Sequence, residues 1–530
     1  LSPSSAASDV YKRQPYTRGE DSGQNQWTWQ HYNATVGYDG TFGRHVVSAS
    51  AGILYNIYKT DFSQNGAAGK MVEYRHMTVN GAVNYAYDDR YVATFSFAAD
   101  GSDNYRPGNR WGFYPSLGLG WIVSRERFLR DSRMVDLLKL RASVGKNGWD
   151  PMGEMRYLWE GYYTGRGGLN TGNSEHTWHG GTALSYLPNP DVFAEKSLKY
   201  DAGIDLRLWN RLSLNVDLFL EKRSGIVTQD WMIPGASGVD NPPYRNIGRM
   251  TNKGFEVQLS WADRIGDFNY ALTGMASYNS NKVDYMAEVV TVPTAARTGR
   301  RLDALFGYVA DGFYDWDDFD VGGELREGLP KPTFGAVQPG DIKYKNLNGD
   351  TVIDENDQTA IGDSYLPKLQ YSFSLAASYK GFDLFALFQG AAGRDVNLLD
   401  APLQNVAFRD NGNVYGIAEG RWAYYPEQGI DTRATATYPR LSLQDNSNNY
   451  RNSTLWKRSG DFLKLRNVEL GYTFAQPSLS KAGISKIRIY LSGVNLLTVS
   501  RLMRDYDIDP EILSGHPALK SYNLGLTVTF

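Results

Sequence analysis

The fold is decided by residues 197–223, which run SLKYDAGIDLRLWNRLSLNVDLFLEKR. Apolar residues occupy alternate positions from 198 to 208 and, after Trp209, Asn210 and Arg211, again from 212 to 220. This period of two predicts two antiparallel strands joined by a tight turn. Each strand would have one aliphatic face and one face that carries charges of both signs.

Such a hairpin fits two kinds of protein. In a soluble antiparallel sheet the apolar face packs on a core and the charged face is solvated. In a transmembrane β-barrel the apolar face meets lipid and the charged face lines an aqueous interior. The hairpin alone does not distinguish a soluble sheet from a barrel, so the rest of the chain must decide between them.

The composition favours the barrel. The 530 residues include 55 Gly, 36 Tyr, 22 Phe and 13 Trp, but only 42% of them are hydrophobic. Barrel strands have this composition because only every second residue faces lipid. No apolar run reaches the roughly 18 residues that a transmembrane helix needs. A net charge of −3 argues against nucleic-acid binding, and the absence of Cys excludes disulfides and thiolate metal sites.

Segments with the same alternation of apolar and polar residues recur along the chain. Short turns and long connections separate them by turns. They amount to about fifteen or sixteen strands, too many for one sandwich. The long segments 147–196, 224–246, 290–339 and 391–457 lack the period and are predicted loops. The final segment, 522–530, ends on Phe530, which is the usual ending of an outer-membrane barrel. The predicted strands are 27–38, 45–60, 72–87, 91–99, 112–124, 135–146, 197–208, 212–223, 254–262, 268–279, 365–378, 382–389, 462–473, 487–495 and 522–530.

The first fourteen residues, LSPSSAASDVYKRQ, have neither an apolar run nor a period. We expect residues 1–14 to be a scar of cloning or sequence assembly, outside the fold. The barrel is therefore assigned to residues 15–530.

Several blocks together resemble the C-terminal half of the SusC/RagA family of TonB-dependent outer-membrane transporters. The resemblance spans residues 26–530, and the blocks occur in the family's order. They are NIGRM (246–250), NKGFEV (252–257), GDIKY (340–344), NLNGD (346–350), YRNSTLW (450–456), GDFLKLRNVELGY (460–472) and SGVNLLT (492–498).

The resemblance implies an all-β, transmembrane antiparallel barrel of 22 strands around an N-terminal plug, in the outer membrane of a Gram-negative bacterium. It also implies a SusD-like surface lipoprotein as partner, TonB–ExbB–ExbD as energy source, and oligosaccharides or, in some members, peptides as substrates. We expect this chain to be a fragment that supplies the later strands and long extracellular loops, without signal peptide or plug.

Two functions remain beside oligosaccharide import. One is peptide import by the same family, and the other is a non-transporting outer-membrane barrel for binding or adhesion that displays the same loops. An enzyme is not expected, because no Ser, His and acidic cluster stands out by motif.

Residues 346–357, NLNGDTVIDEND, match the spacing of a twelve-residue calcium loop. Against a Ca²⁺ site, Thr351 replaces the usual turn-forming Gly and the last position is Asp instead of Glu. A metal-free loop of Asx turns is the alternative. The candidate ligands are Asn346, Asn348, Asp350, Val352 through its carbonyl, Asp354 and Asp357.

Tryptophans in the predicted loops are the candidate substrate-binding residues. Sugar rings stack on exposed aromatic faces, while nearby polar side chains bind hydroxyls. The alternative is that each ring packs loops together. The candidates are Trp149, Trp178, Trp231, Trp316 and Trp422.

Overall fold

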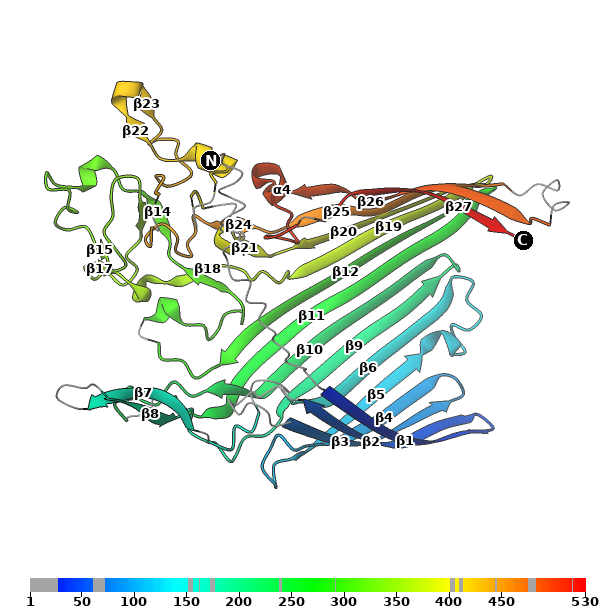
Figure 1. Ribbon diagram of the computed structural model, residues 1–530. Coiled ribbons are helices and arrows are strands. Elements are labelled where there is room, and N and C mark those ends of the chain that lie inside the picture. The colour runs from blue at the N-terminus through cyan, green and yellow to red at the C-terminus, as the bar shows by residue number, and fades with distance from the viewer. Residues whose placement is uncertain are drawn as a thin grey trace, which may run out of the picture.

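Fifteen strands form one antiparallel sheet in the computed structural model (Figure 1). The structure describes residues 27–60, 72–150, 156–161, 163–171, 177–237, 241–290, 292–400, 406–408, 413–443, 446–474, 483–516 and 518–530. The prediction for residues 1–14 lies outside this part. The strands are β1 (Trp27–Phe42), β2 (His45–Thr60), β3 (Val72–Tyr87), β4 (Tyr91–Ser102), β5 (Trp111–Ile122), β6 (Val135–Trp149), β9 (Glu195–Leu208), β10 (Leu212–Gln229), β11 (Tyr244–Ile265), β12 (Phe268–Tyr285), β19 (Leu369–Tyr379), β20 (Phe382–Ala392), β25 (Phe462–Phe474), β26 (Lys486–Ser500) and β27 (Ser521–Thr529).

Every predicted strand is present, and the strands follow one another across the sheet in chain order. The hairpin that decides the fold consists of β9 and β10, with Leu212 paired to Leu208. Trp209 and Asn210 have φ of 53° and 50°, the left-handed conformation that matches the twist of a tight hairpin. Tight turns of this kind lie at one end of the sheet, and the long connections lie at the other (Figure 1).

The prediction of loops in the long connections is wrong in part, because they contain short two-stranded sheets. β7 pairs with β8 within residues 147–196, and five further pairs of short strands form within the later connections or bridge them. Glycines and polar residues hide the period of two in such short strands. These strands are β7 (Tyr163–Thr171), β8 (Thr177–Leu184), β13 (Leu305–Gly307), β14 (Ala310–Phe313), β15 (Lys331–Pro332), β16 (Ile342–Tyr344), β17 (Val352–Ile353), β18 (Thr359–Gly362), β21 (Asp395–Asn397), β22 (Tyr424–Tyr425), β23 (Ile430–Asp431) and β24 (Lys457–Ser459).

The helices are short. In the described residues they are the α-helix α4 (Arg501–Tyr506) and the 3-10 helices η1 (Val123–Arg125), η2 (Gly235–Ser237), η3 (Pro293–Ala295), η4 (Trp316–Asp318), η5 (Glu355–Asp357), η6 (Leu398–Asp400), η8 (Gly416–Gly420) and η9 (Pro426–Gln428). In the part of the chain that the structure describes, no helix has the length and apolar character needed to cross a membrane.

The two faces of the sheet differ as the period predicts. On one face, large apolar side chains such as Leu218, Leu259, Leu272 and Leu491 are exposed. The other face carries the ion pairs described below. The main buried core therefore lies outside the sheet, in the long connections, where twelve residues pack together. They are Tyr308, Ile342, Tyr344, Ile353, Val396, Leu398, Ala407, Ala418, Tyr438, Trp456, Leu502 and Ile508.

Leu218→Arg tests the assignment of the apolar face to lipid. Leu218 is 57% exposed between Ala202 and Phe255 on the neighbouring strands. An arginine at mid-depth in hydrocarbon costs about 2–4 kcal/mol. We expect equilibrium urea unfolding of the protein in lipid vesicles to show a free energy of unfolding lower by that amount.

The matched control is Asn215→Arg, three residues away on the opposite face. We expect a change of about 0.5 kcal/mol or less, because that side chain points to the polar side. Equal losses for the two variants would contradict the assignment of the faces.

Candidate functional site

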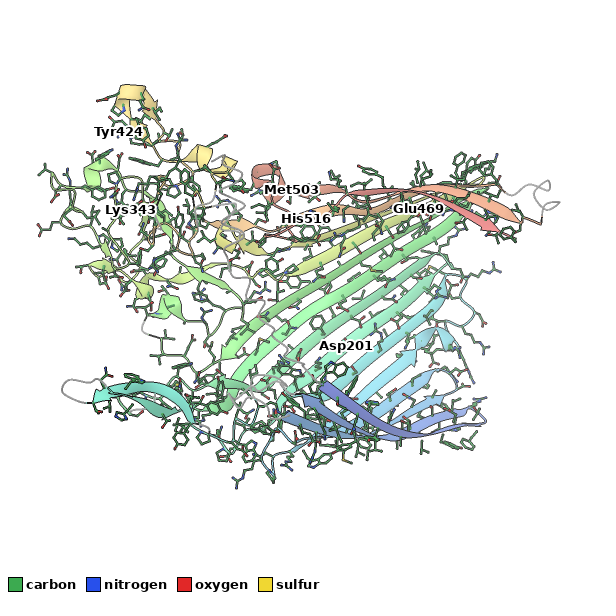
Figure 2. The ribbon with its side chains drawn as sticks, in the orientation of Figure 1. Asp201, Lys343, Tyr424, Glu469, Met503 and His516 are labelled. Carbon is green, nitrogen blue, oxygen red and sulfur yellow. The ribbon has the colours of Figure 1, made fainter. Side chains whose placement is uncertain are left out.

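The polar face of the sheet carries an ion-pair group on β6, β9 and β10. Arg141 donates to Asp217 through both terminal nitrogens, and its Nε donates to Asp205 at 3.3 Å. Its Nη1 lies 3.6 Å from Asp201, which is labelled in Figure 2, and Lys139 lies 3.8 Å from Asp205. Three carboxylates thus face two cations. Such a charged group belongs on a water-filled side of the sheet, since unpaired charges in lipid are costly.

A second ion-pair group lies on β20, β25 and β26. Arg488 Nε donates to Asp383 at 3.1 Å, and Nη2 donates to Glu469 at 2.6 Å. Glu469 is labelled in Figure 2, far across the sheet from Asp201. Ion pairs therefore occur on this face at two places, on β6–β10 and on β20–β26.

The first cavity on this face has a volume of about 520 Å³ and lies where β3–β6, β9 and β10 approach the long connections. His76 Nε2 lies 3.0 Å from Asp100, which also accepts a hydrogen bond from Thr78 at 2.6 Å. The indole of Trp149 lies 5.8 Å from the Arg223 guanidinium. Further lining residues are Tyr114, Asn147, Glu195, Lys199 and Glu221. The cavity combines an aromatic face with charges of both signs.

A second cavity, of about 360 Å³, lies between the two ion-pair groups. Its polar lining is largely neutral and comes from β10, β11, β12, β19 and β20. Amides and hydroxyls are groups that can both donate and accept hydrogen bonds. The lining includes Asn215, Gln258, Ser277, Gln370, Ser372 and Gln389, with Asp217 and Glu256.

The connections β12–β19 and β20–β25 are tied together by one buried carboxylate, Asp341. Its Oδ1 accepts hydrogen bonds from Asn446 at 3.0 Å and Asn449 at 2.9 Å, and Arg440 Nε lies 2.7 Å away. Its Oδ2 accepts the backbone N–H of Gln338 at 2.8 Å. The side chain of Asp341 is fully buried, so these partners replace the water that a carboxylate otherwise requires. The described parts of the two connections therefore pack against each other beyond the end of the sheet (Figure 2).

The connection β26–β27 is held by a buried lysine of β25. Lys464 Nζ donates to Asp509 and to Glu511, both at 2.7 Å. Arg466 makes a second ion pair with Glu511. Lys464 is 1% exposed, and its buried charge is compensated by the carboxylates that it contacts.

The five predicted tryptophans occupy different positions. Trp149 ends β6 and lines the first cavity. Trp178 on β8, Trp231 and Trp316 are each more than half exposed. Trp422 is 8% exposed and packs against Gly340, a packing position without a free ring face. The structure does not bring the five together, and their role in substrate binding stays a prediction.

The family of the chain follows from comparison with known proteins. The sequence profile described as "TonB dependent receptor-like, beta-barrel" matches residues 2–496. The chain belongs to this family. It is accordingly an outer-membrane β-barrel protein, and its apolar face is the lipid-facing surface.

Individual relatives agree with the family. TonB-dependent receptor P3 of Formosa agariphila is 26% identical over 93% of this chain and 51% of the relative. TonB-dependent receptor SusC of Bacteroides thetaiotaomicron is 26% identical over 85% of this chain and 43% of the relative. The solved RagAB peptide transporter has the same fold, with a TM-score of 0.71 at 21% identity over 96% of this chain and 56% of that chain. The chain spans about half the length of the curated relatives that it matches.

The predicted calcium loop of the receptor barrel is ordered by its own side chains. Asn348 and Asp350 accept backbone N–H groups two residues ahead, at 3.0 and 2.8 Å. Asp357 is buried and accepts the N–H groups of Leu347 at 2.7 Å and Asp354 at 2.9 Å. In the described residues no group of three or more His, Asp or Glu side chains is placed to hold a metal. Calcium binding stays a prediction.

Sequence reasoning missed the wall residues of the receptor barrel as a site. The cavity residues Gln258, Gln370 and Gln389 lie on three strands and are scattered in the sequence. In the sequence, the only indication was that each of the three occupies one of the alternate positions that form the polar face of its strand. That signal identifies a face and does not identify a cavity.

A calcium titration of wild type and Asp350→Ala tests the loop. If the loop binds Ca²⁺, the variant loses the site, because removing one charged oxygen ligand weakens a hard-cation site. Isothermal titration calorimetry measures the difference, with Asp311→Ala on β14 as the control. Equal calcium binding by Asp350→Ala and wild type would remove the site.

The carboxylates held by Lys464 predict a pH dependence. Burial alone raises the pKa of Asp509, but hydrogen bonds from Lys464 and a backbone N–H outweigh it and hold the pKa below its ordinary 3.8. The pKa of Glu511 is likewise lowered from 4.5, because the hydrogen bonds from Arg466 and Lys464 outweigh burial. A lowered carboxyl pKa stabilises the folded state above the unfolded value, and this stabilisation is lost as the pH falls through the folded value.

We therefore expect amide protection of residues 507–513, corrected for intrinsic exchange, to fall as the pH is lowered from about 5 toward 3. Asp509→Asn lowers the protection at neutral pH and makes it depend less on pH. A wild-type profile that is flat down to pH 3 would contradict the role of these carboxylates.

Proposed function

We propose that this receptor barrel imports oligosaccharides across the outer membrane in a TonB-dependent manner. The observation that supports it most is the second cavity, whose amide and hydroxyl lining matches the hydroxyl groups of a sugar. Its volume of about 360 Å³ falls within the usual range for small-ligand sites. Trp149, in the first cavity, adds an exposed ring on which a sugar can stack.

Membership of the family supports two partners. TonB–ExbB–ExbD would supply the energy for import. A SusD-like surface lipoprotein would close over the long connections, whose described parts are packed together by the buried core and by Asp341. Transport leaves the ligand chemically unchanged, so we expect oligosaccharide incubated with the protein to be recovered intact by chromatography.

Peptide import is the second candidate. The first cavity carries both signs of charge, with Lys199 and Arg223 near Glu195 and Glu221, which suits the charged ends of a peptide. A peptide transporter also has the same fold. A barrel that only binds or adheres would engage the same ligands without uptake.

The double variant Gln258→Ala, Gln370→Ala tests the oligosaccharide assignment. Each amide lost from a sugar contact removes about 0.5–1.5 kcal/mol, so we expect roughly tenfold weaker binding. Isothermal titration calorimetry measures it for the protein with its lipoprotein, against a panel of oligosaccharides and peptides. Gln428→Ala, at an exposed position at the end of η9, is the matched control.

The possible results separate the candidates. Tight oligosaccharide binding that weakens in the double variant supports the proposal. Binding of peptides alone, weakened by Arg223→Ala, supports the second candidate. Ligand binding without TonB-dependent uptake by cells supports the third candidate, a non-transporting barrel for binding or adhesion.

A further inference from the structure

A basic cluster lies on the lipid-facing surface of β10, β11 and β12. It consists of Lys222, Lys253 and Lys282, all exposed. Lys222 follows Leu220 by two residues and shares its outward face. The strand pairing places Thr251 between Lys222 and Lys282 in one row. Lys253 lies two residues from Thr251 on the same strand, so all three lysines point outward.

The three lysines occupy neighbouring positions on the sheet. Lys253 is the diagonal cross-strand neighbour of both Lys222 and Lys282, a relation that separates residues by about 7–8 Å. Arg249, two residues before Thr251 on the same face, stacks on the ring of Tyr285 at 5.3 Å. Like charges at this spacing repel one another unless an anion lies between them.

The protein supplies little negative charge to this cluster. Among the described residues, none of the three lysines makes an ion pair or a side-chain hydrogen bond. Asp284 lies nearby, but its carboxylate accepts a hydrogen bond from the Thr251 hydroxyl at 2.5 Å. Three positive charges, with Arg249 beside them, thus face one carboxylate.

The depth of the cluster is set by the apolar row below it. The outward residues of β10 from Leu212 to Leu220 are all apolar and form the hydrocarbon-facing part of the strand. With a rise of about 3.3 Å per residue and a tilt near 40°, this row spans about 20 Å of membrane. Lys222 is the next outward residue, on the side of the long connections. The cluster therefore lies at the level of the lipid headgroups.

We propose that Lys222, Lys253 and Lys282 bind the phosphate-bearing headgroup of a lipid in the outer leaflet. Each ammonium group has three hydrogen-bond donors, and a phosphate has several acceptor oxygens and negative charge. The headgroup would supply the anion that the protein lacks, while its acyl chains lie against the apolar row below. The inference depends on the lipid-facing surface and not on the imported substrate.

The alternative is that the lysines extend into water above the membrane and bind nothing. A solvated cluster and a headgroup site predict different effects of lipid phosphorylation on binding. A solvated cluster would not distinguish a phosphorylated lipid from the same lipid without phosphate. A headgroup site would.

The experiment uses the protein in detergent micelles with fluorescent diphosphoryl lipid A, its dephosphorylated form and sodium phosphate as probes. The test variant is Lys222→Gln, Lys253→Gln, Lys282→Gln. The control is Lys331→Gln, Lys486→Gln, Lys520→Gln, which removes the same charge from exposed positions elsewhere. Heat-dependent migration on gels confirms that each variant is folded, and Lys253→Gln alone serves if the triple variant is not.

Each lysine near a charged lipid surface contributes about fivefold in affinity, so we expect the triple variant to bind diphosphoryl lipid A more than tenfold more weakly. The control and wild type should bind it equally, and the dephosphorylated lipid should bind weakly to all. Equal affinities of test and control variants would overturn the proposal. So would equal binding of the two lipids, or complete displacement of the lipid by free phosphate, which would indicate a phosphate site without lipid.

Discussion

The structure depends on the need to hydrogen-bond every backbone N–H and C=O group that enters hydrocarbon. No water is present there to replace a missing partner, so strands span a membrane only as members of a continuous ladder. Thirteen of the fifteen strands, β2 to β26, have a partner on both sides within the described sheet. β1 and β27 pair with one strand each in this part of the chain. The polar face and the cavities exist because this ladder holds side chains at fixed heights and on fixed sides.

The strands were predictable because lipid and water impose opposite chemistry on neighbouring residues. Along β10, Leu214, Val216 and Leu218 alternate with Asn215 and Asp217, and no tertiary contact is needed to see it. β7 and β8 were missed because Gly and polar residues leave no such pattern in their sequences, YTGRGGLNT and TWHGGTAL. In the loops, the burial of a side chain depends on residues that are distant in the sequence. It therefore cannot be predicted from the neighbouring residues.

The candidate site was predictable only as far as a face. Charges on the interior of β9 were visible in the sequence, but the grouping of Asp201, Asp205 and Asp217 around Arg141 depends on the register of three strands. The burial of Trp422 follows from its contact with Gly340, more than eighty positions earlier. Asp341 likewise meets Asn446 and Asn449 across a separation of more than one hundred residues. Contacts of this range come from the fold.

The strict alternation of faces also limits how the wall can change. Adding or removing one residue within a strand turns every later side chain to the opposite face, which moves leucines into water and aspartates into lipid. Length changes in the wall are therefore tolerable in steps of two, or where a bulge absorbs the odd residue, as beside Gly225 on β10 and at Asp284 on β12. The long connections carry no such restriction. The long connections can thus vary freely in length. Insertions and deletions in the wall must instead keep each later side chain on its own face of the sheet.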